Sequence, residues 1–138
     1  MALDQSTLNK LRDIGGAENV LTAKEDLIPY AFDGTAVLKE SPGCVVFTTG
    51  TEHVSAVLKL ANDTGTPVVT RGAGTGLAGG ANAGAGEIAL SVRRMDRILD
   101  IRPDDLVAVV EPGIINADLN AALLPHGLWW APDPASRA

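Results

Sequence analysis

The chain has 138 residues, 46% of them hydrophobic and 20% charged, and a net charge of −6 at pH 7. This composition fits one globular domain, and the acidic balance argues against nucleic acid as a partner, because binding it requires a basic face that displaces counterions. No apolar run reaches the ~20 residues of a transmembrane segment, and the N-terminus lacks the apolar core of a secretion signal. A single cysteine, Cys44, excludes an internal disulfide, so we expect a reducing, cytoplasmic setting.

The N-terminal segment, residues 1–41, is predicted to be helical in part. Leucine and isoleucine recur at helical spacing over residues 8–14, and two glycines follow. Thr22 and Glu25 indicate a capping box for a second short helix that runs to Leu27. The sequence after that helix, FDGTAVLKESPG, is expected to be irregular.

A strand–helix–strand unit is predicted next. Residues 44–47 and 67–70 are short apolar runs typical of strands, with Cys44 as a small buried hydrophobe rather than a nucleophile. The helix between them begins at Thr51 and ends at Gly65. The short return loop makes the two strands parallel. Four apolar residues mark the face of the helix that we expect to be buried: Val54, Val57, Leu58 and Ala61.

Three further strands and a helix complete the described pattern. The strands are expected at residues 88–92, 98–101 and 106–110, with the turn sequence RPDD between the last two. A short helix is predicted over residues 117–124, capped by Asn116 or Asp118. The final sequence, WWAPDPASRA, contains prolines that forbid regular structure, and we expect the chain to stop inside a domain, with Trp129 and Trp130 uncovered.

The most informative stretch is the glycine-rich sequence at residues 71–80, RGAGTGLAGG. Glycine permits positive φ and close backbone approach, so successive N–H groups can converge on an anion. The order of strand, loop and strand places this nest at the end of a strand, with Arg71 at its edge as a charge-assisted contact. We interpret the loop as a cradle for a diphosphate; the alternative is a flexible surface loop.

Two other phosphate motifs fit less well. Gly74, Gly76 and Gly79 spell G-x-G-x-x-G, with Asp96 near the position of a ribose-binding acid, but the glycines that follow cannot sustain the helix that opens a dinucleotide-binding motif. A Walker A loop needs a Gly-Lys pair, and no lysine follows Lys59.

These residues resemble the first diphosphate-binding loop of FAD-linked oxidases with the vanillyl-alcohol-oxidase type (PCMH-type) of flavin domain. The motifs RMD at residues 94–96, VEPG at 110–113 and APDPAS at 131–136 extend the resemblance over nearly the whole chain. Within the family, the chain is similar to the FAD subunit of glycolate oxidase and to D-lactate and D-2-hydroxyglutarate dehydrogenases. The resemblance implies an α+β fold, with residues 42–138 forming the first part of an FAD-binding domain that is incomplete at its C-terminus.

The resemblance also implies which residues hold the cofactor. The loop would offer backbone N–H groups, Thr75 a hydroxyl, and the last segment contacts to the flavin end. The set is Arg71, Gly72, Ala73, Gly74, Thr75, Gly76, Leu77, Gly79, Gly80, Pro132, Asp133 and Ser136. Some family members tether FAD through a histidine at the position of Thr75, so non-covalent FAD is implied here. His53 is expected to be a solvated helix residue and His126 a turn residue.

The activity that the resemblance implies is oxidation of a small 2-hydroxy acid, of the glycolate or D-lactate type, by hydride transfer to flavin. Relatives continue with a second glycine-rich stretch and a cap domain that carries the catalytic and metal-binding residues. We therefore name no catalytic residue and no metal ligand, and we expect this fragment alone to be inactive. The intact enzyme would have the hydroxy acid and further oxidase subunits as partners. The alternative is a non-catalytic nucleotide-binding or assembly module, with the two tryptophans as its interface.

Overall fold

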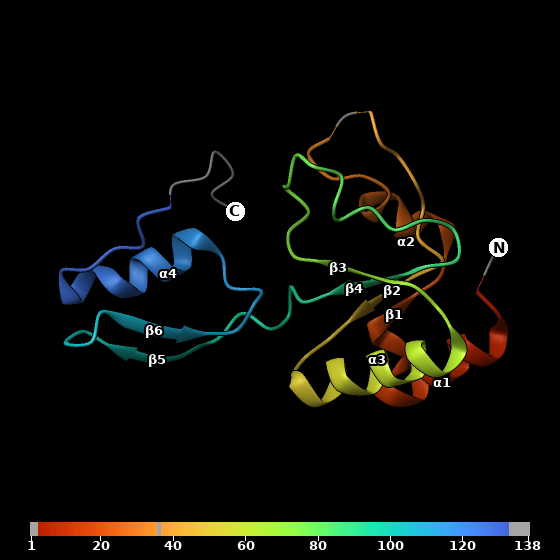
Figure 1. Ribbon diagram of the computed structural model, residues 1–138, viewed down its shortest axis with the longest axis horizontal. Coiled ribbons are helices and arrows are strands. Elements are labelled where there is room, and N and C mark those ends of the chain that lie inside the picture. The colour runs from red at the N-terminus through yellow and green to blue at the C-terminus, as the bar shows by residue number, and fades with distance from the viewer. Residues whose placement is uncertain (1–2, 36, 133–138) are drawn as a thin grey trace. The chain divides into compact units, whose positions relative to one another are not determined.

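The computed structural model describes residues 3–35 and 37–132, and the chain divides into two compact units, Met1–Arg94 and Met95–Ala138. Each unit combines helices with strands (Figure 1). The predicted α+β class is therefore confirmed.

A four-stranded sheet forms the centre of the first unit. Its spatial order is β1-β2-β4-β3, where the strands are β1 (Val20–Leu21), β2 (Cys44–Phe47), β3 (Val68–Arg71) and β4 (Ile88–Ser91). β4 is parallel to both of its neighbours, and β1 is antiparallel to β2. The predicted parallel direction of β2 and β3 is confirmed, although β4 lies between them.

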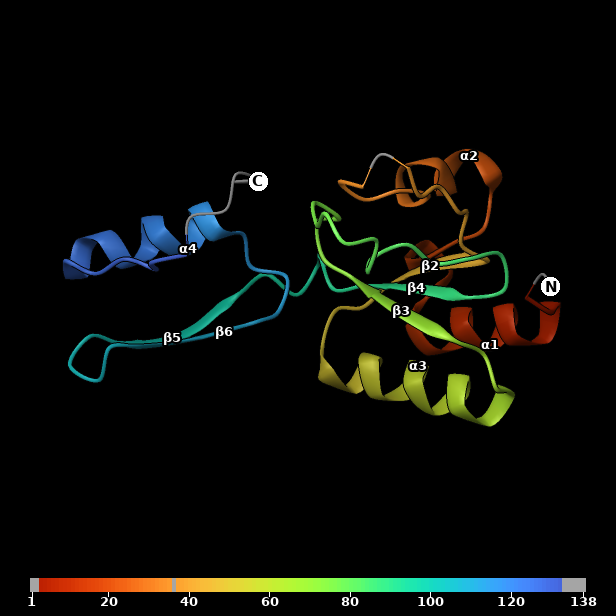
Figure 2. The same cartoon turned by 45° about the horizontal axis from the view of Figure 1, so that its top comes forward.

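Helices cover both faces of this sheet. α1 (Gln5–Gly15) and α3 (Thr51–Thr64) lie on one side, and α2 (Lys24–Leu27) lies on the other (Figures 1 and 2). Asp4 caps α1 by accepting from the Thr7 N–H at 2.9 Å. Two 3-10 turns, η1 (Ala17–Asn19) and η2 (Ile28–Tyr30), flank β1 and α2 in the chain.

The core of the first unit is built on its two central strands, β2 and β4. Every residue of β2 and β4 is buried, as expected for parallel strands covered on both faces. Val45, Phe47 and Ala89 pack with Leu27 of α2 and with Ala83, which precedes β4. Cys44 is fully buried, and burial raises the pKa of its thiol to about 12, so its predicted role as a small hydrophobe is confirmed.

The N-caps predicted for two of the helices are wrong. Ala23 is the N-cap of α2 and makes no side-chain cap bond; Thr22 instead accepts a hydrogen bond from Arg12 at 3.2 Å. In the second unit, Ile115 is the N-cap of α4, again without a side-chain bond. Asn116 is already helical, and its amide donates to the Pro132 carbonyl at 2.9 Å. Both helices are held by tertiary packing, which overrides local capping preference.

Two predictions on α3 also need correction. The helix begins at Thr51 and is capped by left-handed Gly65, as predicted, but Leu58 is 47% exposed and Leu60 is buried in its place. His53 is not simply solvated. Its ring packs against Gly15 of α1, where a Cβ would collide with the imidazole, and its Nε2 is buried without a hydrogen-bond partner among the described residues.

The second unit is a β-hairpin followed by a helix. β5 (Ile98–Arg102) and β6 (Val107–Val110) pair antiparallel, and α4 (Asn116–Leu123) runs into a 3-10 turn, η3 (Leu124–His126). These elements match the predicted ranges to within one residue at each end. Leu106, predicted as a strand residue, lies in the turn with a φ of 56°. Glu111 stabilises the base of the hairpin by accepting from the Arg97 N–H and guanidinium, with Nη2 at 2.7 Å.

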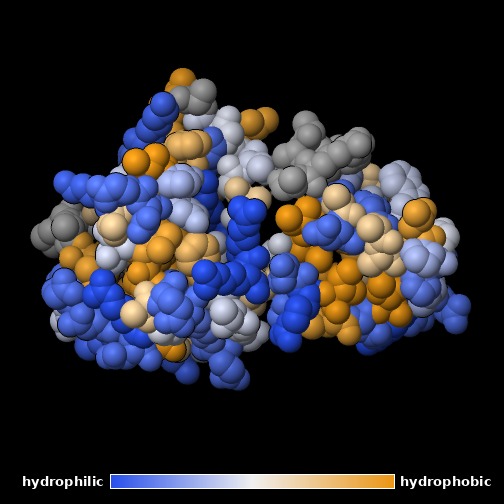
Figure 3. Space-filling view, turned by 180° about the vertical axis from the view of Figure 1, so that it is seen from behind, coloured by the Kyte–Doolittle hydropathy of each residue, from blue (hydrophilic) through white to orange (hydrophobic). Residues whose placement is uncertain are grey.

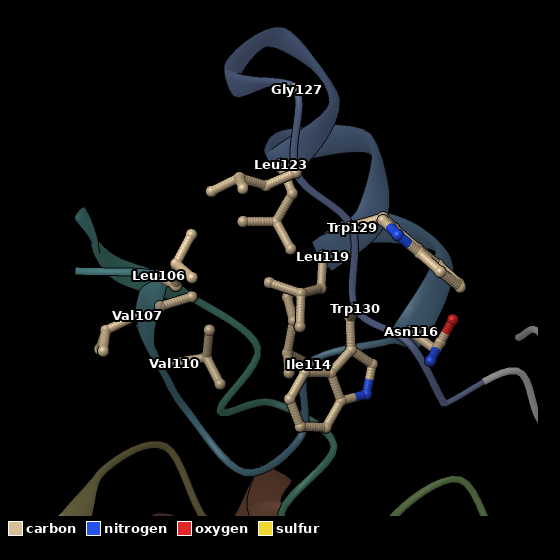
Figure 4. Close-up of a pocket in the computed structure, with 12 residues that line it drawn as sticks. Leu106, Val107, Val110, Ile114, Asn116, Leu119, Leu123, Gly127, Trp129 and Trp130 are labelled. Carbon is tan, nitrogen blue, oxygen red and sulfur yellow. The ribbon is translucent and has the colours of Figure 1, made fainter. Parts of the chain in front are cut away.

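Apolar side chains gather on the surface of the second unit (Figure 3). They line a groove between the hairpin and α4, where Leu119 and Leu123 of the helix face Leu106 and Val110 (Figure 4). Trp129 and Trp130 stand at its rim and are 71% and 51% exposed. We call this feature the apolar groove.

Candidate cofactor site

The glycine-rich loop leaves the sheet at the carboxyl end of β3. Arg71 is the last residue of that strand, and the chain returns to the sheet only at Ile88, where β4 begins. Because the neighbouring strands are parallel, β2 and β4 end at the same edge. Ligands of parallel α/β sheets bind at this edge, so the loop lies where a ligand site is expected.

The backbone of this loop offers a run of free donors. Within the part of the chain that the structure describes, none of the N–H groups of residues 72–78 donates to a protein acceptor. These residues are exposed or half-buried. Unpaired N–H groups in series are what an anion nest requires, because phosphate oxygens can complete their hydrogen bonds.

The loop is also free of side chains on part of its surface. A Cβ added at Gly72, Gly76 or Gly80 would meet nothing within 4 Å. Gly74 and Gly79 have φ values of 75° and 73°, which glycine adopts without strain. The space over these glycines can therefore take a bulky anionic group such as a diphosphate, and the residues present fit that group.

Arg71 does not point into this space. Its side chain is buried, and its guanidinium donates to the carbonyls of Ala81, Pro29 and Phe32 at 3.3, 3.2 and 2.8 Å. Burial lowers the pKa of Arg71, while the Asp33 carboxylate opposes that shift, and the guanidinium stays charged. Arg71 thus makes its hydrogen bonds within the chain, and its contact with a diphosphate stays a prediction.

The remaining predicted residues are placed as follows. Thr75 is exposed, and its hydroxyl has no partner among the described residues; Leu77 is 80% exposed. Pro132 is exposed in the second unit and accepts from Asn116. Asp133 and Ser136 lie outside the described residues. The loop residues from Gly72 to Gly80 are therefore together, and their contacts to a cofactor stay a prediction.

Sequence reasoning missed three polar residues that border the loop. Asp33 is buried, accepts from the Thr35 N–H at 2.7 Å and from Asn82 at 3.5 Å, and its second oxygen has no partner among the described residues. The Thr35 hydroxyl and the Asn82 carbonyl oxygen are likewise buried and unpaired there. The Asp-Gly-Thr sequence indicates a local turn, but no local pattern reveals that this turn packs on a loop forty residues later.

Two other kinds of site are absent from the described residues. No group of three or more His, Cys, Asp or Glu side chains there could hold a metal ion. No helix in that part of the chain is both long and apolar enough to cross a membrane.

Comparison with known proteins agrees with a flavin site. Residues 42–138 match the family model described as "FAD binding domain". Glycolate oxidase subunit GlcD of Escherichia coli (strain K12) is 40% identical over 132 residues, which are 96% of this chain and 26% of that protein. A probable mitochondrial D-lactate dehydrogenase of Danio rerio is 31% identical over 97% of this chain and 27% of its own length.

A solved structure has a similar fold. p-Cresol methylhydroxylase with substrate bound superposes with a TM-score of 0.79 at 27% identity, over 91% of this chain and 26% of that one. The fold is thus that of the N-terminal part of a flavin-binding domain of the PCMH type. The chain belongs to the FAD binding domain family, with FAD as its cofactor, and it spans about a quarter of the length of the relatives it matches.

Proposed function

We propose that this chain holds the diphosphate of FAD, without a covalent bond, in an oxidoreductase that oxidises a small 2-hydroxy acid. The observation that carries the proposal is the run of unpaired N–H groups at residues 72–78, beneath a surface that glycine leaves open. Thr75 stands where a tethering histidine would be needed, and a threonine forms no such bond. When bound, FAD would supply the acceptor for the two electrons that leave the alcohol carbon.

The substrate class is supported by the relatives. Those compared above are named as a glycolate oxidase subunit and a D-lactate dehydrogenase, and another is named as a D-2-hydroxyglutarate dehydrogenase. All three names contain a 2-hydroxy acid. We extend this class to the full-length gene product, together with further oxidase subunits as partners and a cytoplasmic location. Residues 42–138 would be its partial flavin domain, and the 138-residue chain alone would have no turnover.

The space over Gly76 provides the test. We expect Gly76→Val in the full-length protein to weaken FAD binding at least about a hundredfold, or ~2.8 kcal/mol, because the new side chain would occupy the diphosphate space. Thermal stability should be unchanged, since a Cβ at this position meets no protein atom within 4 Å. Flavin absorbance after gel filtration and titration of the apoprotein with FAD measure the effect.

Ala85→Val is the matched control, because Ala85 is also exposed and lies in the same connection between β3 and β4 but beyond the loop. It should bind FAD like the wild type. Undiminished FAD binding by Gly76→Val would show that the diphosphate does not lie on this loop.

A second candidate, an assembly module without turnover, is favoured by the exposed tryptophans at the apolar groove. The reading frame beyond residue 138 separates the two functions. A second glycine-rich segment followed by several hundred residues favours the oxidoreductase, and a stop codon at that point favours the module.

A further inference from the structure

We propose that residues 29–35 and Arg71 form a clasp that fixes the shape of the glycine-rich loop before FAD arrives, with Arg71 and Asp33 as positioning residues that act through the loop backbone. The identity of the ligand rests on the proposed function above. The existence of the clasp does not, because it is a property of the chain without ligand.

The Arg71 guanidinium joins the two ends of the loop. The residue stands at the start of the loop, and its Nη1 donates to the carbonyl of Ala81 at the far end. Its Nη2 donates to Pro29 and Phe32, and the guanidinium carbon lies 5.6 Å from the centre of the Tyr30 ring. A planar guanidinium can bridge three carbonyls at once, which the single ammonium of lysine cannot match in geometry.

The same guanidinium limits what the loop can carry. A Cβ at Gly74 would collide with Nη2, Cζ and Nε of Arg71. Glycine at this position is thus required twice, by its φ of 75° and by the closeness of Arg71. The loop therefore packs directly on the Arg71 guanidinium, and this contact leaves the N–H groups of residues 72–78 unpaired within the described part of the chain.

Gly34 contacts the middle of the loop. Its N–H donates to the Gly76 carbonyl at 2.8 Å, and a Cβ at Gly34 would lie 2.7 Å from that oxygen and 2.9 Å from the Thr75 carbonyl oxygen. In a trans peptide the C=O and the following N–H point in opposite directions. A hydrogen bond to the Gly76 carbonyl therefore turns the Leu77 N–H away from residues 29–35, toward the side where a ligand would lie.

Asp33 secures the end of the loop. Its buried carboxylate accepts from Asn82 and from the Thr35 N–H, and the bond from Thr35 is the main cause that lowers the pKa of this carboxyl group. It also interacts electrostatically with Arg71, so the clasp contains a cation and an anion. Because these opposite charges partly offset each other, the attraction for phosphate comes from the backbone N–H groups.

The clasp has a consequence for the boundary of the cofactor site. Residues 29–35 precede the stretch that matches the family model, which begins at residue 42. They nevertheless contact the start, middle and end of the loop. A site defined by the matched residues alone would omit the segment that holds it in shape.

The test measures the order of the loop in the 138-residue chain without FAD. In the wild type, backbone NMR order parameters for residues 72–80 should be near the ~0.85 of rigid backbone, and in Arg71→Met they should fall below ~0.6. Amides of β2 and β4 should be unchanged in both proteins. Arg93→Met is the matched control, because Arg93 is exposed and its side chain makes no hydrogen bond to the loop among the described residues.

Gly34→Ala gives a second route that keeps every charge. Its added methyl group would press on the Gly76 carbonyl, so it should also mobilise the loop, whereas Gly50→Ala, where a Cβ meets nothing within 4 Å, should not. The proposal is overturned if the loop is already mobile in the wild type, or if it stays ordered in both Arg71→Met and Gly34→Ala.

Titration of the full-length protein with FAD separates this proposal from the previous one. Mobilisation of the loop by Arg71→Met in a protein that does not bind FAD would leave the clasp standing and refute the proposed function. Loss of FAD binding by Arg71→Met while the loop stays ordered would indicate a direct contact with phosphate, and the clasp would be refuted.

Discussion

Single residues show how far side-chain chemistry depends on partners distant in the sequence. An arginine beside a glycine-rich loop suggests a phosphate contact, yet Arg71 donates to three carbonyls of its own chain. Two of those carbonyls come from Pro29 and Phe32, about forty residues earlier. The glycine spacing could be predicted to form a nest because it is local; the environment of Arg71 could not, because it depends on tertiary structure.

The ionisation of His53 also depends on its tertiary environment. Burial lowers the pKa of His53 below its ordinary value of 6.5. The unfolded chain therefore binds a proton more readily than the folded chain, and this histidine lowers stability as the pH falls below about 6.5. Asp4, Asp33 and Glu111 also have lowered pKa values, but they lose their contribution only below their ordinary values of 3.8 to 4.5.

We expect the free energy of unfolding of the wild type to fall between about pH 7.5 and pH 5.5, and to fall less in His53→Gln, which removes the titrating group. Urea unfolding at the two pH values measures both. His126→Gln, which removes the exposed histidine of η3, is the matched control. Identical pH dependence in the wild type and His53→Gln would contradict this account.

Whole elements are predicted well where hydrophobic pattern and glycine punctuation agree. β2, α3 and β4 have their predicted ends to within one residue, because apolar runs bounded by glycine or threonine leave few alternatives. The order of the strands could not be predicted, because nothing local indicates that β4 lies between β2 and β3. Thr22 is likewise of a residue type that caps helices, but its hydroxyl accepts a hydrogen bond from Arg12 of another helix.

The buried face of α3 can be checked with two leucines of the same helix. Leu60 is 9% exposed and Leu58 is 47% exposed. Leu60→Ala should lower the free energy of unfolding by about 2–4 kcal/mol, through lost burial and a residual cavity, and Leu58→Ala by less than about 1 kcal/mol. Denaturant unfolding of both variants decides the matter, and equal losses would place the buried face elsewhere.

At the scale of the whole chain, the apolar groove is the surface feature that bears on association. Leu106, Trp129 and Trp130 line it and are exposed, and exposed apolar area of this kind promotes association. Leu106 is 76% exposed and has a φ of 56°, a conformation that favours asparagine over leucine.

We therefore expect the 138-residue chain to self-associate at high concentration, and Leu106→Asn to reduce that association at least about threefold. The same change should not destabilise the hairpin, because asparagine tolerates a positive φ. Sedimentation velocity over a concentration series measures the effect. Val37→Asn, a comparable loss of an exposed apolar side chain in the first unit, is the control and should leave association unchanged. A wild-type chain that stays monomeric would remove the groove as an associating surface.

The central position of β4 matters while the protein is being made. Cys44 pairs with Ile88, so β2 leaves the ribosome about forty residues before its partner. At a synthesis rate of ~5–20 residues per second, the delay is roughly 2–8 seconds. During that time the apolar sequence CVVF has an unpaired edge and no neighbour on that side of the sheet. We expect slow codons between residues 48 and 87 to prolong this exposure and thereby to favour aggregation of the nascent chain.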